Sequence, residues 1–548
     1  MKSENDSGEK LLSMTGLKIE GQAAEGWIEI VHGVDVHLNR GEVLGLIGES
    51  GAGKSTIGLA AMGYTHPGCR ISGGSIIFDG QELTTASDEE LRKLRGARVA
   101  YVAQSAAASF NPAHKLINQY SEIPVQHGVL SQSQAEIEAV DLFGRLDLPN
   151  PDTIGFRYPH QVSGGQLQRA MTAMAMSCKP DLIVFDEPTT ALDVTTQIEV
   201  LAAIRDIVQQ FNTAAIYVTH DLAVVAQMSD RIMVLKMGDL VEEGNARDMI
   251  ANPQEEYTAQ LLSVRSFRKP QTETKDADAP LLRITNLNAH YGDFHVLKEI
   301  NADIHRGKTV AIVGESGSGK STMARAVTGL LPPTTGEVLY DGKALPGSYR
   351  DRSKDQLRLM QMIYQMPDTA LNPRQKIGEI IGRPLSFYLG YDGEARSKKV
   401  AELLDMIELP ADFATRFPSE LSGGQKQRIC IARALAAEPD MIICDEVTSA
   451  LDELVSEEIL KLLQRLQDDL GVTYMFITHD LATVRAISDE IVVMLQGEIV
   501  EHGMKDDVLA PPHHEYTDLL LSSVPEMDPD WLDKVLEDRK GKMRAAGN

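Results

Sequence analysis

The pattern of hydrophobic and polar residues changes in the same order along each half of the chain. A first segment alternates as strands do and leads to an apolar run, Val43–Ile47 in the first half and Val310–Val313 in the second. A middle stretch, about 115–180 and 376–438, has the spacing of helices, and further short apolar runs follow it. Strands that alternate with helices predict a mostly parallel sheet with helices on its faces. The middle stretch predicts a helical insertion.

The two halves are copies of one another. Matching landmarks lie 266 residues apart at Lys54 and Lys320, and the spacing is constant at 259 residues from Ser163 and Ser422 onward. A near-constant spacing over many landmarks indicates a duplicated domain with a few small insertions in the first copy.

A polar segment, residues 266–280, separates the copies. It ends in proline and contains few large apolar residues, which indicates a flexible linker. We therefore expect one domain over residues 1–265, a second over 281–524 and a tail over 525–548.

The tail is predicted to form a short helix. Trp531, Leu532, Val535 and Leu536 recur at roughly helical spacing. We expect this helix to dock on the second domain, which directly precedes it in the sequence.

A glycine-rich motif follows each apolar run. It reads GESGAGKST from Gly48 and GESGSGKST from Gly314. Glycines let consecutive backbone N–H groups curl around phosphates, and the positive end of the following helix attracts the same anion. A glycine-rich loop alone is more often an ordinary turn, but this motif stands twice between a strand and a helix and predicts two bound nucleoside triphosphates. The residues predicted to bind them are Gly48, Ser50, Gly51, Gly53, Lys54, Ser55, Thr56, Gly314, Ser316, Gly317, Gly319, Lys320, Ser321 and Thr322.

Two neighbouring acids end a later apolar run in each copy, Asp186–Glu187 and Asp445–Glu446. Carboxylates at the end of a buried strand cost free energy unless a cation or hydrogen bonds receive them. A solvated loop is the simpler interpretation, but the phosphate-binding motif upstream favours a functional site.

A second anion-binding motif, Ser-Gly-Gly-Gln, begins a long helix in each copy. Small residues at a helix start expose backbone N–H groups. The motif comprises Ser163, Gly164, Gly165 and Gln166 in the first copy, and Ser422, Gly423, Gly424 and Gln425 in the second. With the phosphate loops and the acid pairs, this set resembles the ATP-binding cassette (ABC) ATPases, and the resemblance covers nearly the whole chain.

The resemblance implies an α/β fold of two tandem P-loop NTPase (ABC) domains, each a RecA-like core with a helical subdomain and an N-terminal antiparallel β region. It also implies ATP and Mg²⁺ as ligands and an ATPase reaction. The implied Mg²⁺ ligands are Ser55, Gln104, Asp186, Ser321, Gln365 and Asp445. The implied catalytic residues are Glu187 and Glu446, which would polarise the attacking water, and His220 and His479, which would bind the γ-phosphate. The segments Ala191–Asp193 and Ala450–Asp452 match the family's D-loop.

In this family each nucleotide lies between the phosphate loop of one domain and the signature of the other. Lys54 would then face Ser422, and Lys320 would face Ser163. Closing a pair of domains takes ~5.5 kcal/mol of differential binding. Two γ-phosphates with charge-assisted hydrogen bonds of ~1.5–3 kcal/mol each could supply it. The resemblance therefore implies a clamp driven by ATP, with two hydrolysing sites in one chain.

The residue that stacks on adenine differs between the copies. Tyr291 stands where the family places an aromatic residue. Two alignments give Gly21 or Glu25 at this position of the first copy, and neither can stack. Trp27 is close enough in sequence to substitute.

The composition argues against several classes of partner and site. The net charge of −26 and the pI near 5.0 argue against a nucleic-acid binder. The four cysteines form neither a disulfide framework nor a zinc motif. The N-terminal residues are charged, without the apolar stretch of a secretory signal, and no run of apolar residues is long enough to cross a membrane.

Two further repeats indicate the branch of the family. Pro253, Tyr257 and Thr258 recur in the second copy with the same spacing, and an Asn-Pro step follows Gln104 and Gln365. This is similar to the dipeptide and oligopeptide importers, with the two usual ATPase subunits fused. It implies a peripheral ATPase on the cytoplasmic face of a bacterial inner membrane, with two transmembrane permease subunits and an extracytoplasmic solute-binding protein. The alternative is a soluble tandem ABC ATPase that acts on ribosomes or DNA, but the short linker and the acidic charge favour the importer.

Overall fold

The computed structural model describes residues 9–23, 26–189, 192–263, 268–270, 279–449 and 451–546. The chain divides into two compact units, one formed by Met1–Ser263 with Pro525–Asn548 and one by Val264–Val524. The expected domain boundary at residues 265 and 266 lies outside the described residues, as do Ala191 and Ala450 of the two D-loops.

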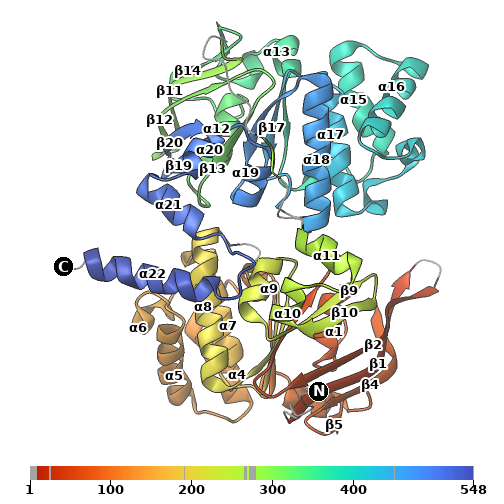
Figure 1. Cartoon of the computed structure of the whole chain (residues 1–548), viewed down its shortest axis with the longest axis vertical. Helices are drawn as coiled ribbons and strands as arrows, with labels where there is room; N and C mark the ends of the chain where they lie inside the picture. The colour runs from red at the N-terminus through yellow and green to blue at the C-terminus, as the bar shows by residue number, and fades with distance from the viewer. Residues whose placement is uncertain are drawn as a thin grey trace. The chain divides into compact units, whose positions relative to one another are not determined.

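The core of the first unit is a six-stranded sheet with the strand order β10-β9-β3-β8-β7-β6. Figure 1 labels β9 and β10 of this sheet. Strands β9, β3, β8, β7 and β6 are parallel, and β10 pairs antiparallel with β9. Every residue of β7 and β8 is buried, as expected for a parallel sheet covered on both faces. The strands are β3 (Val43–Ile47), β6 (Val99–Val102), β7 (Leu182–Asp186), β8 (Ala214–Val218), β9 (Arg231–Lys236) and β10 (Asp239–Asn245).

A second, antiparallel sheet of the first unit has the order β2-β1-β4-β5. Its inward-facing residues join β3 and α1 in one hydrophobic core. The alternation in the sequence is therefore that of strands with one buried face. The strands are β1 (Lys10–Ala23), β2 (Gly26–Asn39), β4 (Cys69–Phe78) and β5 (Gln81–Glu82).

The predicted helical insertion of the first unit is confirmed. Helices α4, α5 and α7 bury their apolar faces against each other and against the core sheet. The helices of this unit are α1 (Lys54–Ala60), α2 (Asp88–Leu94), α3 (Ala106–Ser109), α4 (Leu116–Gln126), α5 (Gln132–Arg145), α6 (Pro151–Ile154), α7 (Gly164–Met176), α8 (Val194–Phe211), α9 (Leu222–Met228), α10 (Ala246–Ala251), α11 (Glu256–Ser263) and α22 (Trp531–Ala546).

The second unit repeats this architecture. Its sheets have the orders β16-β17-β18-β13-β19-β20 and β12-β11-β14-β15. The strands are β11 (Leu282–Tyr291), β12 (Phe294–Ile304), β13 (Thr309–Val313), β14 (Thr335–Tyr340), β15 (Lys343–Ala344), β16 (Met360–Ile363), β17 (Met441–Asp445), β18 (Thr473–Ile477), β19 (Glu490–Leu495) and β20 (Glu498–Met504). The helices are α12 (Lys320–Val327), α13 (Lys354–Leu359), α14 (Pro367–Ala370), α15 (Ile377–Leu389), α16 (Gly393–Met406), α17 (Gly423–Leu435), α18 (Glu453–Leu470), α19 (Leu481–Ile487), α20 (Lys505–Leu509) and α21 (Glu515–Ser522).

The tail forms the expected helix, α22, but the expectation that it docks on the second domain is wrong. Residues 525–548 belong to the first unit. Trp531 and Leu532 are buried in the core of that unit, with Val535 and Leu536 packed against it. The spacing of apolar residues defines which face of a helix is buried, but not the surface that buries it.

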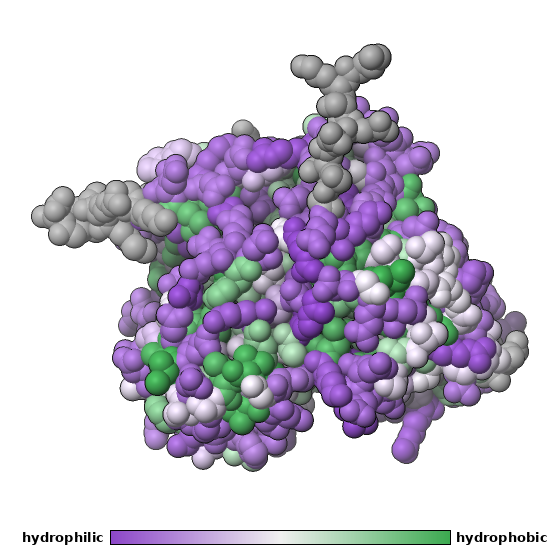
Figure 2. Space-filling view, turned by 90° about the horizontal axis from the view of Figure 1, so that it is seen from below, coloured by the Kyte–Doolittle hydropathy of each residue, from purple (hydrophilic) through white to green (hydrophobic). Residues whose placement is uncertain are grey.

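Figure 2 shows one face of the molecule, on which hydrophilic residues predominate and hydrophobic patches lie between them. Within the described ranges, no helix is both long and apolar enough to span a membrane.

Candidate active sites

Each phosphate loop joins the central strand of its sheet to a helix, β3 to α1 and β13 to α12. Gly48 and Gly314 have φ of 144° and 149°, which disfavours any residue with a side chain. A Cβ at Gly48 would lie 2.1 Å from the carbonyl oxygen of Leu235, and one at Gly314 would lie 2.2 Å from that of Met494. The neighbouring strand thus requires glycine at the start of each loop.

The two loop lysines are buried and point back into their own loops. Lys54 Nζ donates to the carbonyls of Gly48 at 2.6 Å and Glu49 at 2.8 Å. Lys320 Nζ donates to Gly314 and Glu315, both at 2.7 Å. Each ammonium is therefore held at the mouth of a loop of backbone amides, where it can move to a phosphate.

The first acid of each pair meets the loop serine. Ser55 Oγ donates to Asp186 Oδ1 at 2.8 Å, and Ser321 Oγ donates to Asp445 Oδ1 at 2.9 Å. A hydroxyl beside a carboxylate is an all-oxygen set of the kind that Mg²⁺ prefers when phosphates complete its shell. Across the described part of the chain no group of three or more His, Cys, Asp or Glu could hold a metal. The oxygen atoms of each serine–aspartate pair fit Mg²⁺ that is bound together with a nucleotide.

The second acid of each pair meets the glutamine and the histidine. Gln104 Nε2 donates to Glu187 at 2.8 Å, and His220 Nδ1 lies 3.1 Å from the other carboxylate oxygen. In the second unit Gln365 lies 2.6 Å and His479 lies 3.5 Å from Glu446. Glu187 and Glu446 also have positive φ, 49° and 50°, which is uncommon for a residue with a side chain and clusters at functional sites.

The two sites differ at one residue that the sequence analysis did not single out. In the first unit Tyr101 on β6 donates its hydroxyl to Asp186 Oδ2 at 2.7 Å. Burial and the hydrogen bond to Asp186 raise the pKa of Tyr101, so the phenol remains a donor at neutral pH. Met362 stands at the matching position of β16, three residues before Gln365. Burial raises the pKa of Asp445, although the hydrogen bond from Ser321 opposes this shift.

The Glu446–His479 pair makes the second unit sensitive to pH. The hydrogen bond from His479 lowers the pKa of Glu446. Burial alone would lower the pKa of His479, but the hydrogen bond to Glu446 and its charge outweigh burial and raise it. A raised histidine pKa stabilises the fold below the ordinary value of ~6.5, and this stabilisation is lost as the pH rises through the raised value.

We therefore expect His479→Gln to destabilise the protein most at pH values below ~6.5. The difference in melting temperature between wild type and variant should shrink as the pH rises toward 8.5, because the stabilisation by His479 is lost as the pH rises through its raised pKa. Thermal denaturation across this range measures it. His66→Gln, at an exposed histidine, is the control. A difference that grows with pH would contradict the assignment.

Each signature serine caps the helix that it precedes. Ser163 Oγ accepts from the backbone of Gln166 at 3.3 Å, and the side chain of Gln166 accepts from the backbone of Ser163 in return. Ser422 and Gln425 form the same capping box. A Cβ at Gly165 would lie 2.2 Å from Thr196 on α8, and one at Gly424 would lie 2.5 Å from Val455 on α18. These glycines therefore serve helix packing as well as the exposure of backbone amides.

Tyr516 is a further residue that the sequence analysis did not assign to the site. It lies on α21, is buried, and accepts the backbone N–H of Glu315 in the phosphate loop at 2.8 Å. Together with Lys320, which holds the loop carbonyls, it fixes the start of the loop. The recurrence of a tyrosine at matching positions, Tyr257 and Tyr516, was the feature of the sequence that could have indicated this role.

We expect Tyr516→Phe to raise the KM for ATP several-fold and to leave kcat nearly unchanged. The loop amide loses its acceptor, a loss of ~1–3 kcal/mol when the group is buried, while the reacting groups stay in place. Steady-state ATPase kinetics measure both constants. Tyr349→Phe, at a half-exposed tyrosine of the same unit, is the matched control, and an unchanged KM in Tyr516→Phe would contradict the role.

The aromatic residues near the hairpin ends differ between the units, as expected. Tyr291 is exposed and its hydroxyl accepts from Arg325 at 3.2 Å. Counting from the matching pairs of Leu12 with Phe78 and Leu282 with Tyr340, Gly21 takes the position of Tyr291. Glu25, the other candidate, lies outside the described residues. The guanidinium of Arg70 lies 4.1 Å from the ring centre of Trp27, so an adenine would have to use the other face of this ring.

The structure thus gathers the phosphate loop, both acids, the glutamine and the histidine of each unit into one cluster, in which the loop serine contacts the first acid and the glutamine and histidine contact the second. The assignment of these residues to catalysis and binding stays a prediction, as do the pairings of Lys54 with Ser422 and of Lys320 with Ser163.

The chain matches two family models. The ABC transporter model covers residues 31–190 and 297–449, and the model of the oligopeptide/dipeptide transporter C-terminal region covers residues 500–547. The second match includes Tyr516 and most of the tail.

Curated relatives match over nearly the whole chain. The glutathione import ATP-binding protein GsiA of Salmonella paratyphi A is 36% identical, over 95% of this chain and 90% of the relative. GsiA of Escherichia coli O6:H1 is also 36% identical, over 96% of this chain and 91% of the relative. Among solved structures, cbiO1 of Clostridium perfringens, part of an ABC transporter complex, is 31% identical over 42% of this chain and 91% of that one, with a TM-score of 0.39.

The family models, the relatives and the two clusters agree. The chain belongs to the ABC transporter family, as an ATP-hydrolysing subunit that carries two ATPase domains and the C-terminal region of the oligopeptide and dipeptide transporters.

Proposed function

We propose that this chain binds two ATP molecules, each with Mg²⁺, between the phosphate loop of one unit and the signature of the other, and that their hydrolysis drives the import of peptides or similar small solutes. The observation that carries the proposal is the cluster in each unit. Ser55 and Asp186 lie in hydrogen-bond contact at the same end of the sheet as Glu187, Gln104 and His220. The relatives' role in glutathione import agrees with a peptide cargo.

The residues of each unit have distinct tasks in this reaction. The loop amides and Lys54 or Lys320 bind and orient the triphosphate, which supplies the positioning that phosphoryl transfer requires. Bound Mg²⁺ would neutralise charge on the phosphates, held by the serine and the first acid of each pair. Glu187 and Glu446 accept the proton of the attacking water. His220 and His479 hold these carboxylates in place and donate to the γ-phosphate.

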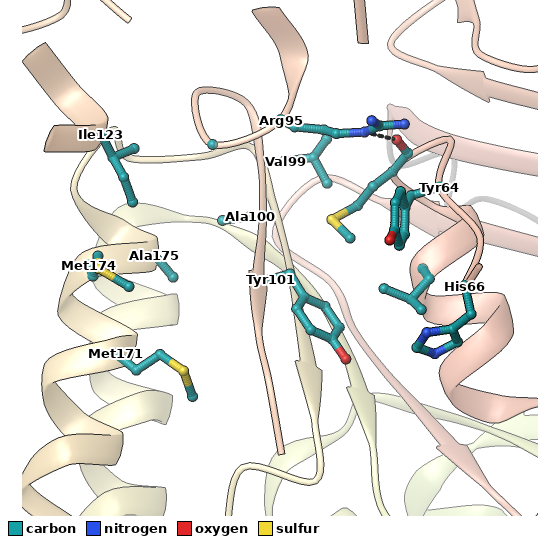
Figure 3. A pocket seen from close by; sticks show the side chains of 13 residues that line it. Tyr64, His66, Arg95, Val99, Ala100, Tyr101, Ile123, Met171, Met174 and Ala175 are labelled. Carbon is teal, nitrogen blue, oxygen red and sulfur yellow. Dashed lines mark hydrogen bonds between the residues drawn. The ribbon is translucent and has the colours of Figure 1, made fainter. Parts of the chain in front are cut away.

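A cavity of the first unit offers a surface for a permease. It has a volume of about 490 Å³ and lies between the helical subdomain and the core (Figure 3). Met171, Met174 and Ala175 of α7 line one side, and Tyr64 and Tyr101 line the other. Methionines adapt to the shape of a partner, and exposed aromatic residues are frequent anchors of interfaces. Since Tyr101 also binds Asp186, an occupant of the cavity contacts a residue that contacts the ATP site.

The partners follow from this function. Two transmembrane permease subunits receive the movement of the ATPase units, and an extracytoplasmic solute-binding protein delivers the cargo. The chain itself acts as a peripheral subunit on the cytoplasmic face of a bacterial membrane.

We expect Tyr64→Arg to weaken capture of the permease subunits from solubilised membranes at least tenfold and to leave basal ATPase activity unchanged. Loss of an interface tyrosine costs ~2 kcal/mol or more, and tenfold corresponds to ~1.4 kcal/mol. Ile28→Ala, at an exposed residue of β2, is the control. Capture of ribosomes in place of two multi-span proteins would contradict the importer and favour a soluble tandem ATPase.

A further inference from the structure

The segment that ends the chain is built into the first unit. Trp531 and Leu532 are 6% and 0% exposed and share a hydrophobic core with α7 and α8. Figure 1 shows α22 beside α8. The chain therefore leaves the second unit after Val524 and completes the core of the first.

A buried glutamine of the first unit forms hydrogen bonds to the backbone of this segment. Gln227 on α9 donates its amide to the carbonyls of Glu526 at 2.9 Å and Asp528 at 2.6 Å, and its side-chain oxygen accepts the N–H of Leu532 at 3.0 Å. Two ion pairs flank these bonds, Arg205 with Asp533 and Arg247 with Asp530, both at 2.5 Å. Because a buried amide without partners is costly, Gln227 is matched to the turn that leads into α22, where it binds two carbonyls and one N–H of this segment.

The linker between the copies is bound in the opposite sense, since it follows the first copy in the sequence and is held by the second unit. Residues 268–270 belong to the second unit. Lys269 Nζ lies 2.7 Å from the buried carboxylate of Asp489 and 2.9 Å from Gln467 Oε1. The backbone N–H of Lys269 donates to Arg485 of α19 at 3.2 Å, and Lys505 donates to the carbonyl of Lys269.

These two segments occupy matching positions of the duplicated sequence. The constant spacing of 259 residues relates Lys269 to Asp528. It also relates Gln227 to the residue that directly follows Arg485 on α19. In both copies, the residues that follow the helix α11 or α21 bind beside α19 or α9 of the opposite unit.

We infer that residues 268–270 and 525–539 are two reciprocal straps, each extending from one ATPase unit and bound by the other, which keep the units associated when no nucleotide joins them. The surface of α8, α9 and α10 is the binding site for the C-terminal strap. Only the place of the straps in the transport cycle rests on the proposed function. The association itself requires neither ATP nor a permease.

The test uses the full chain with a protease recognition sequence in place of residues 271–278. After cleavage and without nucleotide, both straps remain attached to their fragments. We expect the two fragments to elute together in size-exclusion chromatography. In the Trp531→Ala, Leu532→Ala double variant the dissociation constant should rise about a hundredfold or more.

Two further measurements separate lost binding from lost folding. Glu537→Ala with Asp538→Ala, at exposed residues of the same helix, should leave the fragments together. A synthetic peptide of residues 525–548, added in excess to the cleaved wild type, should release the second fragment by competition. The inference is overturned if the cleaved wild type separates without nucleotide, or if neither the variant nor the peptide changes the association. Because ATP is absent throughout, these outcomes do not depend on the proposed hydrolysis.

Discussion

Replacing both Glu187 and Glu446 with glutamine should lower ATP turnover by ~10²–10⁴-fold, the usual contribution of a general base. Glutamine keeps the shape of glutamate and can still contact Gln104 or Gln365, but it cannot accept a proton from water. The lysines and the loop amides are untouched, so ATP binding should persist. Phosphate release measures turnover, and equilibrium binding of ATP measures the retained affinity.

The structure supplies a matched control for this change. Glu136 and Glu402 are exposed glutamates on α5 and α16. Their double replacement by glutamine removes the same charge, far from the phosphate loops in sequence, and should leave turnover near the wild-type rate. Intact turnover in the Glu187, Glu446 variant would remove these residues from catalysis, whatever the state of binding.

The hydrolysis-deficient chain should trap two ATP molecules, and combinations of variants should reveal which residues share a site. If Lys54 shares a site with Ser422, then Lys54→Ala with Ser422→Arg damages one site only. One trapped ATP should remain per chain. Lys54→Ala with Ser163→Arg damages both sites, and none should remain. Rapid filtration with radiolabelled ATP counts the trapped nucleotides.

The opposite result has a clear meaning. One trapped ATP with Lys54→Ala and Ser163→Arg, and none with Lys54→Ala and Ser422→Arg, would place each site within a single unit. Both combinations introduce one bulky arginine at the start of a signature helix, α7 or α17. The comparison therefore isolates the pairing from any general effect of this substitution.

Local motifs were the part that sequence analysis predicted well. The phosphate loop lies between consecutive elements of one βα unit, so its residue types and its place after an apolar strand could be identified without tertiary contacts. The duplication then supported each motif by a second copy. Both acids of each pair could be identified in the same way, because carboxylates after a buried run are costly without partners.

Contacts between distant segments could not be predicted from the sequence. Tyr101 and Asp186 are 85 residues apart, and Tyr516 and Glu315 are 201 apart. Nothing in local periodicity connects such pairs, since only the order of strands in the sheet and the packing of α21 bring them together. The close approach of Gly165 to Thr196 is of the same kind.

The sequence by itself determined that the chain is a duplicated ATPase with two glycine-rich loop motifs and two acid pairs, and that its last segment forms a helix with one apolar face. Only the tertiary structure decided that this face completes the core of the first unit, while Lys269 pairs with the buried Asp489 of the second. The physical reason is that apolar burial is non-directional. An apolar helix face must pack against some other surface of the protein. Which surface it packs against depends on shape and on polar partners such as Gln227, which are assembled only in the folded chain.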